Sequence, residues 1–82
     1  MLFNTSYLIK SYNSNNKQVI VDSQDALSLN TGDQILFIDS FGKIISTTTS
    51  ITATKIEGKT ITLSSFPTLY EGQDIKSVIV IS

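Results

Sequence analysis

The chain has 82 residues with six lysines, seven acidic side chains, and no arginine, histidine or cysteine. This length supports a single hydrophobic core, the missing cysteines exclude disulfides, and the missing histidines remove the commonest transition-metal ligand. Stability must therefore come from the core itself, from oligomerisation or from docking to a partner. Near-neutral charge without arginine argues against nucleic acid as a ligand. No apolar run approaches the ~20 residues that cross a bilayer, so no membrane partner is expected.

The residue types along the chain favour strands over helices. Ile, Val and Thr are frequent, and β-branched side chains fit a pleated sheet better than a helix. The first predicted strand runs from about Phe3 to Ile9, and residues 1–16 are expected to form an extended N-terminal strand or arm. A polar loop at residues 13–16 then leads to a short, wholly apolar strand at residues 19–21.

The next part of the chain contains a turn and a strongly apolar strand. At most one helical turn is expected, around residues 23–27, with Asp22 or Ser23 as its cap. The turn Thr31-Gly32-Asp33 precedes a strand at residues 35–38. Because both faces of that strand are apolar, it is predicted to lie in the centre of the sheet.

A long strand is predicted from Lys43 to about Ile56. Its middle, residues 46–50, consists of Ser and Thr, which favours an exposed edge or a face that meets another chain. Glu57-Gly58 is predicted to form a two-residue hairpin turn, because glycine supplies the positive φ that such turns need. The strand that follows alternates in polarity, which places Ile61 and Leu63 inside.

The last predicted strand runs from Ile75 to Ile81. Strict alternation places Ile75, Ser77, Ile79 and Ile81 on one face, and Lys76, Val78 and Val80 on the other. Because both faces are apolar, the strand must either be paired inside the domain or be covered by a neighbouring subunit.

About six strands with regular spacing predict a small, single-domain, all-β fold over residues 1–82. An antiparallel β-barrel and an antiparallel β-sandwich both fit this pattern.

No catalytic site is evident, and the chain is not expected to be an enzyme. Nucleophilic catalysis by Ser or Thr needs a nearby base, and histidine is absent. Asp33 and Asp39 flank one strand and could in principle act as paired carboxylates. The favoured interpretation is that each carboxylate shapes the turn beside it.

No cofactor or metal site is expected either. Asp22 and Asp25 could offer oxygen ligands to calcium, but a capped turn explains the same residues. The four glycines fall in separate turns, so no glycine-rich phosphate loop exists.

The aromatic residues supply the predicted contact surface. Phe37 and Phe66 are expected in the core, whereas tyrosine is a frequent interface anchor because one end is apolar and the other is polar. For each tyrosine, partial burial in its own domain is the competing interpretation. The predicted interface residues are Tyr7, Tyr12, Tyr70, Lys76, Val78 and Val80.

About half of the chain resembles a known class of module. The resemblance rests on the order Leu29-Asn30-Thr31-Gly32-Asp33-Gln34-Ile35, Gly42-Lys43, Thr49-Ser50-Ile51-Thr52, Ile56-Glu57-Gly58-Lys59-Thr60-Ile61-Thr62-Leu63-Ser64 and Pro67. It is similar to the small β modules of tailed-bacteriophage virion proteins, found in capsid decoration proteins, tail fibres and baseplates.

The resemblance implies a non-enzymatic structural protein of the virion, assembled in the host cytoplasm. Size favours a capsid decoration (cement) protein that stabilises neighbouring capsid subunits. The implied partners are other virion proteins, above all the major capsid protein, and one implied arrangement is a homotrimer. The first alternative is a tail or baseplate adhesion module that binds a receptor glycan on a platform of Tyr12 and Tyr70. The second is a small SH3-like adaptor domain that binds an extended peptide.

Overall fold

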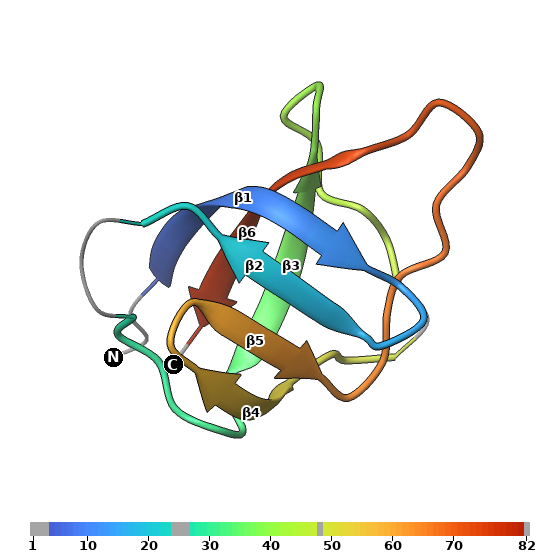
Figure 1. Cartoon of the computed structure of the whole chain (residues 1–82). Helices are drawn as coiled ribbons and strands as arrows, with labels where there is room; N and C mark the ends of the chain where they lie inside the picture. The colour runs from blue at the N-terminus through green and yellow to red at the C-terminus, as the bar shows by residue number, and fades with distance from the viewer. Residues whose placement is uncertain (1–3, 24–26, 48, 82) are drawn as a thin grey trace.

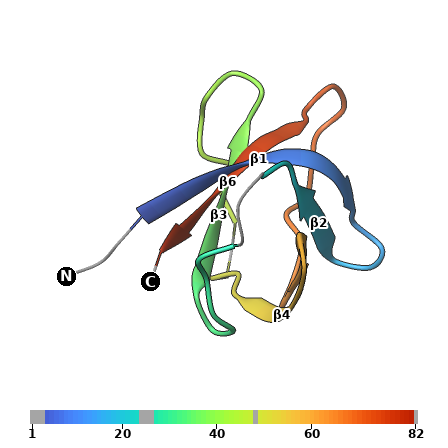
Figure 2. The same ribbon diagram turned by 60° about the vertical axis from the view of Figure 1, so that its left-hand side comes forward.

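The computed structural model describes residues 4–23, 27–47 and 49–81, and within them the fold is all-β (Figure 1). The strands are β1 (Asn4–Asn13), β2 (Gln18–Val21), β3 (Gln34–Asp39), β4 (Ala53–Glu57), β5 (Thr60–Leu63) and β6 (Ile75–Ile81). They form one antiparallel sheet in the order β3-β6-β1-β2-β5-β4, which curls into a half-barrel (Figure 2). The all-β prediction is therefore confirmed, with one curled sheet rather than two stacked ones.

β3 lies at one end of this sheet, so the prediction that it is central is wrong. Its outer edge is covered by residues 43–52, a segment that we call the strap. The N–H of Ile35 donates to the carbonyl of Ile51 (2.8 Å), and the N–H of Ile45 donates to the carbonyl of Phe37 (2.8 Å). These bonds satisfy the edge of β3 without a regular strand, which is how an apolar edge strand avoids pairing with another chain.

The predicted long strand from Lys43 to Ile56 is wrong in its first part. The strap makes isolated bridges at Ile44 and Thr52, and regular pairing starts only with β4. Between the bridges, the Thr47 hydroxyl donates to the carbonyl of Thr49 (2.8 Å). Local bonds of this kind let Ser and Thr compete with a strand ladder, which explains why the hydroxyl-rich stretch is irregular.

A two-residue turn joins β4 to β5, one position later than predicted. Glu57 pairs with Thr60, so the turn residues are Gly58 and Lys59. Gly58 has a φ of 60°, in the left-handed region where a residue with a Cβ is strained. A glycine at the first loop position is the arrangement of a type II′ hairpin.

β6 lies inside the sheet between β3 and β1, so both of its hydrogen-bonding edges are paired with strands of its own domain. A bulge opposite Ile38 and Asp39 interrupts its alternation. As a result Ile75 is buried in the core together with Val78 and Val80, whereas strict alternation predicts it on the opposite face.

β1 is a curved strand inside the sheet rather than an N-terminal arm. Its first half pairs with β6 and its second half with β2, with a register shift between Ile9 and Ser11. Residues 1–16 are predicted to form an extended strand or arm, and in the described part of that range Asn4–Asn13 form the strand β1. The helical turn predicted around residues 23–27 falls largely outside the described residues.

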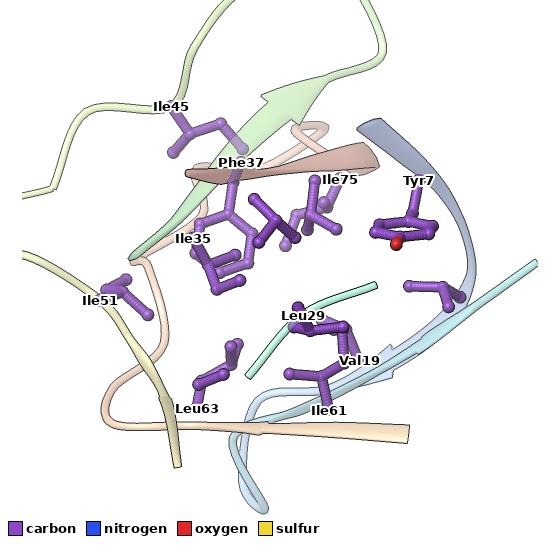
Figure 3. Close-up of a cluster of buried hydrophobic side chains, with 14 residues drawn as sticks. Tyr7, Val19, Leu29, Ile35, Phe37, Ile45, Ile51, Ile61, Leu63 and Ile75 are labelled. Carbon is purple, nitrogen blue, oxygen red and sulfur yellow. The ribbon is translucent and has the colours of Figure 1, made fainter. Parts of the chain in front are cut away.

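The core fills the inside of the curled sheet. Figure 3 shows side chains of β3 and β6 facing those of β2 and β5, with the strap closing one side. The labelled residues are Tyr7, Val19, Leu29, Ile35, Phe37, Ile45, Ile51, Ile61, Leu63 and Ile75. Ile61, Leu63 and Phe37 are buried as predicted, and Phe66 is half-buried against this cluster.

Candidate functional site

Three of the predicted interface residues are buried in the chain's own core. Val78 and Val80 have almost no exposed surface, and Tyr7 packs among the same buried side chains. The hydroxyl of Tyr7 accepts the backbone N–H of Ser28 (2.8 Å), which ties the segment before β3 to β1. These side chains therefore present no surface to a partner, because the register of β6 and β1 turns them inward.

The other predicted residues lie nearer the surface. The ring of Tyr12 stacks on Phe66, with centroids 5.7 Å apart. Lys76 is exposed on the bulge of β6, and Tyr70 exposes 79% of its surface. Phe66 occupies one face of Tyr12, whereas Tyr70 lies largely in solvent.

Tyr12 also anchors the loop that precedes β6. Its hydroxyl donates to the carboxylate of Asp74. This hydrogen bond, assisted by partial burial and by the negative charge of Asp74, raises the pKa of Tyr12 above its usual value of about 10. The bond ties residues 64–74 to the β1–β2 hairpin.

The carboxylates considered for catalysis shape turns, as the favoured interpretation predicts. Asp33 accepts the N–H of Asn30 (2.8 Å). The buried Asp39 accepts the N–H groups of Phe41 and Lys43 (both 2.9 Å) with one oxygen. Both acids are therefore already used by the backbone around β3.

The calcium interpretation involves Asp22 and Asp25, and Asp25 lies outside the described residues. In the part of the chain that the structure describes, no group of three or more acidic side chains comes together as a metal site. The same part contains no helix long and apolar enough to cross a membrane.

The outer surface of β3, β6 and β1 carries contiguous apolar rows, and the exposed charged residues of these strands are Lys10 and Lys76. Residues that pair directly across antiparallel strands point to the same side of a sheet. Leu36 lies opposite Ile79. Ser77 lies between Ile38 on one neighbouring strand and Leu8 on the other. These outward rows thus continue across three strands.

Two further residues extend this surface. The strap residue Ile44 bridges Ile38, and it is exposed where its neighbour Ile45 is buried. Ile81 continues the outward row of β6. We call this group the apolar outer face, and it consists of Leu8, Leu36, Ile38, Ile44, Ile79 and Ile81. The polar members of the same rows with a described side chain are Ser6, Gln34, Thr52 and Ser77, and none of them carries a charge.

The other half of the sheet has a different outer surface. The outward rows of β2, β5 and β4 run from Gln18 through Thr62 to Lys55, and from Ile20 through Thr60 to Glu57. Lys55 and Glu57 form an ion pair along β4. Charged side chains at an edge strand discourage pairing with another sheet. One continuous sheet is therefore polar on one half of its outer surface and apolar on the other.

A second surface feature lies between two loops. The strap and residues 65–73 enclose a groove of about 510 Å³, which we call the loop groove. In Figure 2 the turn that follows β3 and the loop that precedes β6 both project from the end of the barrel away from the termini. Phe41, in the turn before the strap, exposes 83% of its surface, and Tyr70 lines the groove.

Sequence reasoning did not find the apolar outer face, although its signal was present. The strand at residues 35–38 and the strand at residues 75–81 are both apolar on two faces. In residues 35–38 this pattern predicts a central strand. In residues 75–81 it predicts a strand that is paired inside the domain or covered by a neighbouring subunit. In the curled sheet one of the two faces is turned outward instead.

Comparison of the chain with protein-family models, with curated proteins and with solved structures finds no match. The class of the protein is thus defined by its fold and its surfaces: a curled, six-stranded antiparallel β domain with one apolar outer half and a groove between two loops.

Proposed function

We propose that this chain is a non-enzymatic structural protein that attaches to another protein through its apolar outer face. The observation that carries the proposal is the contrast between the two outer halves of a single sheet. Contiguous apolar surface on a small protein marks interaction sites more often than isolated apolar residues do. The partner surface that fits is apolar and uncharged, because a charge buried against this face would lack a counter-charge.

The size of the face decides what kind of attachment it supports. Four neighbouring segments at ~4.8 Å spacing and five residues at ~3.3 Å rise give a footprint of about 300 Å². A stable interface buries about 800 Å² on each partner. The apolar outer face can therefore be the centre of a contact but not the whole of it. This favours a larger partner surface that reaches beyond the face over a simple dimer of two such faces.

The virion setting is the further part of the proposal. A decoration protein holds neighbouring capsid subunits, and a small β domain with an apolar outer half suits that task. The order of turn and strand residues from Leu29 to Pro67 supports this setting, with the major capsid protein as the partner. Sedimentation of the chain with purified virus particles would support it, and its presence only in particle-free fractions would count against it.

Site-specific photo-crosslinking tests the docking face. Leu8 and Ile20 are a matched pair, because both are exposed apolar residues on the outer surface of neighbouring strands (55% and 37% exposed). Leu8 belongs to the apolar half and Ile20 to the polar half. With benzoylphenylalanine at either position, we expect one discrete crosslinked protein from position 8 and none from position 20.

Substitutions then test the crosslinked partner in purified form. Leu8→Lys and Ile79→Lys are expected to weaken its binding at least tenfold, whereas Ile20→Lys leaves binding unchanged. Circular dichroism of each variant shows whether the fold is kept. Crosslinks of equal yield from both positions, or loss of binding with Ile20→Lys alone, would show that the apolar outer face is not the docking surface.

A further inference from the structure

The loop groove differs from the apolar outer face in chemistry. Its floor includes the buried strap residues Ile45 and Ile51, while its walls are rich in hydroxyl groups. The hydroxyl residues that line it are Ser46, Thr47, Thr49, Ser65 and Thr68. A volume of about 510 Å³ lies within the range of sites that bind small molecules. The groove therefore offers many neutral hydrogen-bonding groups around an apolar base.

Tyr70 is held at the rim by a well-defined turn. The N–H of Tyr70 donates to the Gln73 side-chain oxygen (3.0 Å), and the N–H of Gln73 donates to the Tyr70 carbonyl (2.9 Å). Gly72 has a φ of 80°, which a residue with a side chain adopts only under strain. The Tyr12–Asp74 hydrogen bond fixes the end of the same loop. The backbone that carries the exposed ring is thus held in a defined turn before a ligand binds.

The charges around the groove favour a neutral ligand. Two acidic or basic residues line it, Asp39 and Lys43. One oxygen of the Asp39 carboxylate accepts two backbone N–H groups, and its side chain is buried. Lys43 is exposed, and no arginine can join it as a second cation, because the chain contains none. An anionic ligand would meet a single lysine here.

A peptide fits the groove less well than a saccharide. A peptide that binds by adding a strand needs an open sheet edge, and the nearby edge of β3 is already covered by the strap. A saccharide instead needs hydroxyl groups that both donate and accept, and an aromatic face for the C–H side of a sugar ring. Serine and threonine hydroxyls supply the first requirement, and Tyr70 supplies the second.

We propose that the loop groove is a binding site for a short, neutral oligosaccharide that stacks a sugar ring on Tyr70. This site shares Ile44 with the apolar outer face, but saccharide binding and docking through that face are separate proposals, and either can fail without the other. Phe41, on the turn held by Asp39, lies next to the groove residue Lys43 and is available to contact a longer saccharide chain.

The test is a titration of the intact chain followed by backbone amide chemical shifts. The neutral probes are maltotriose, cellotriose and chitotriose at millimolar concentration. The comparison probes are a sulfated heparin tetrasaccharide and a proline-rich decapeptide. We expect at least one neutral probe to shift residues 43–51 and 65–73 in a saturable manner, with no comparable effect of the other two.

Variants separate stacking from other effects. Tyr70→Ala is expected to weaken binding at least tenfold, and Tyr70→Phe, which keeps the ring, to stay within about threefold of the unmodified chain. Thr68→Val removes one lining hydroxyl and is expected to weaken binding several-fold. Leu8→Lys, on the apolar outer face, should leave binding unchanged.

Three results would overturn the proposal. One is the absence of saturable shifts in the groove with every neutral probe. Another is binding of only the sulfated or the peptide probe. The third is full affinity in Tyr70→Ala, since that would show that the ring takes no part.

Discussion

At the scale of single residues, two turn positions with left-handed backbone are occupied by different residue types. Gly58 occupies such a position in the β4–β5 turn, where glycine is unstrained. Lys17, in the turn between β1 and β2, has a φ of 55° although it carries a side chain. Asn13, four residues before Lys17, organises that turn, because its side-chain oxygen accepts the N–H groups of Asn15 and Asn16.

Exchanging residue types at these two positions should have opposite effects on stability. A left-handed conformation costs an ordinary residue about 1–2 kcal/mol. Gly58→Ala is therefore expected to lower the free energy of unfolding by about 1 kcal/mol. Lys17→Gly relieves this strain, but the added freedom of the unfolded chain offsets about 0.4–1 kcal/mol of the gain. The free energy of unfolding is therefore expected to rise by about 0.5 kcal/mol. Urea denaturation measures both, with Lys59→Ala as a neutral control, and a loss of stability in Lys17→Gly would contradict the strain argument.

The Tyr12–Asp74 hydrogen bond predicts a specific alkaline behaviour. The folded state raises the pKa of Tyr12 through its hydrogen bond to Asp74, so the bond stabilises the fold fully below the unfolded pKa of about 10. That contribution is lost as the pH rises through the higher pKa of the folded state. In a titration of tyrosinate absorbance, Tyr12→Phe should remove the component that ionises last.

A comparison of stability completes this prediction. Tyr12→Phe is expected to be less stable than the unmodified chain at neutral pH, and the difference should shrink above pH ~10. Tyr70→Phe, at an exposed ring, serves as the control with no change in stability. An unchanged last component in the Tyr12→Phe titration would mean that another tyrosine forms the strong bond.

At the scale of elements, the strap is the part that departs furthest from its predicted form. It has the composition of a strand, yet it covers β3 through a few backbone bonds and two buried side chains, Ile45 and Ile51. Its contribution to stability should therefore come from these apolar residues rather than from a continuous ladder.

Neighbouring residues of the strap provide a matched test. Ile45 is buried and Ile44 is exposed. Replacing a buried isoleucine by alanine typically costs about 2–5 kcal/mol, whereas exposed changes stay within about 0.5 kcal/mol. Ile45→Ala should therefore lower the free energy of unfolding by at least about 2 kcal/mol, and Ile44→Ala should change it little. Equal effects in chemical denaturation would mean that the strap is not packed on the core as described.

At the scale of the whole molecule, β6 completes the sheet without a strand from a second chain. The last strand of the sequence joins β3 to β1, so its apolar inner face needs no neighbouring subunit. The absence of disulfides therefore does not require an obligate oligomer. What remains for a partner is the apolar outer face, which is smaller than a stable dimer interface needs.

The isolated chain is accordingly expected to be a monomer. Size-exclusion chromatography with light scattering, over a hundredfold range of concentration, should give the mass of one 9.0 kDa chain. Leu8→Lys should not change this mass. A stable trimer in the unmodified chain that dissociates in Leu8→Lys would show instead that a second copy occupies the apolar outer face.

The sequence by itself determined the local features of this protein. Alternation of polarity identified the strand at residues 60–64, and a run of β-branched apolar residues identified the strand at residues 75–81. Turn residues marked most of the boundaries, because all these signals depend on a few neighbouring residues. The turn-forming roles of Asp33 and Asp39 could also be predicted, since each carboxylate acts within four residues of its own position.

Only the tertiary structure decided the surfaces on which the proposed function rests. The sequence of a strand that is apolar on two faces does not predict which face is buried, because this depends on the curvature of the sheet and on the register with distant strands. The bulge that turns Ile75 inward, the strap beside β3 and the inward position of Val78 and Val80 are all set by such non-local contacts. The same contacts leave Leu36 and Ile79 on the outside.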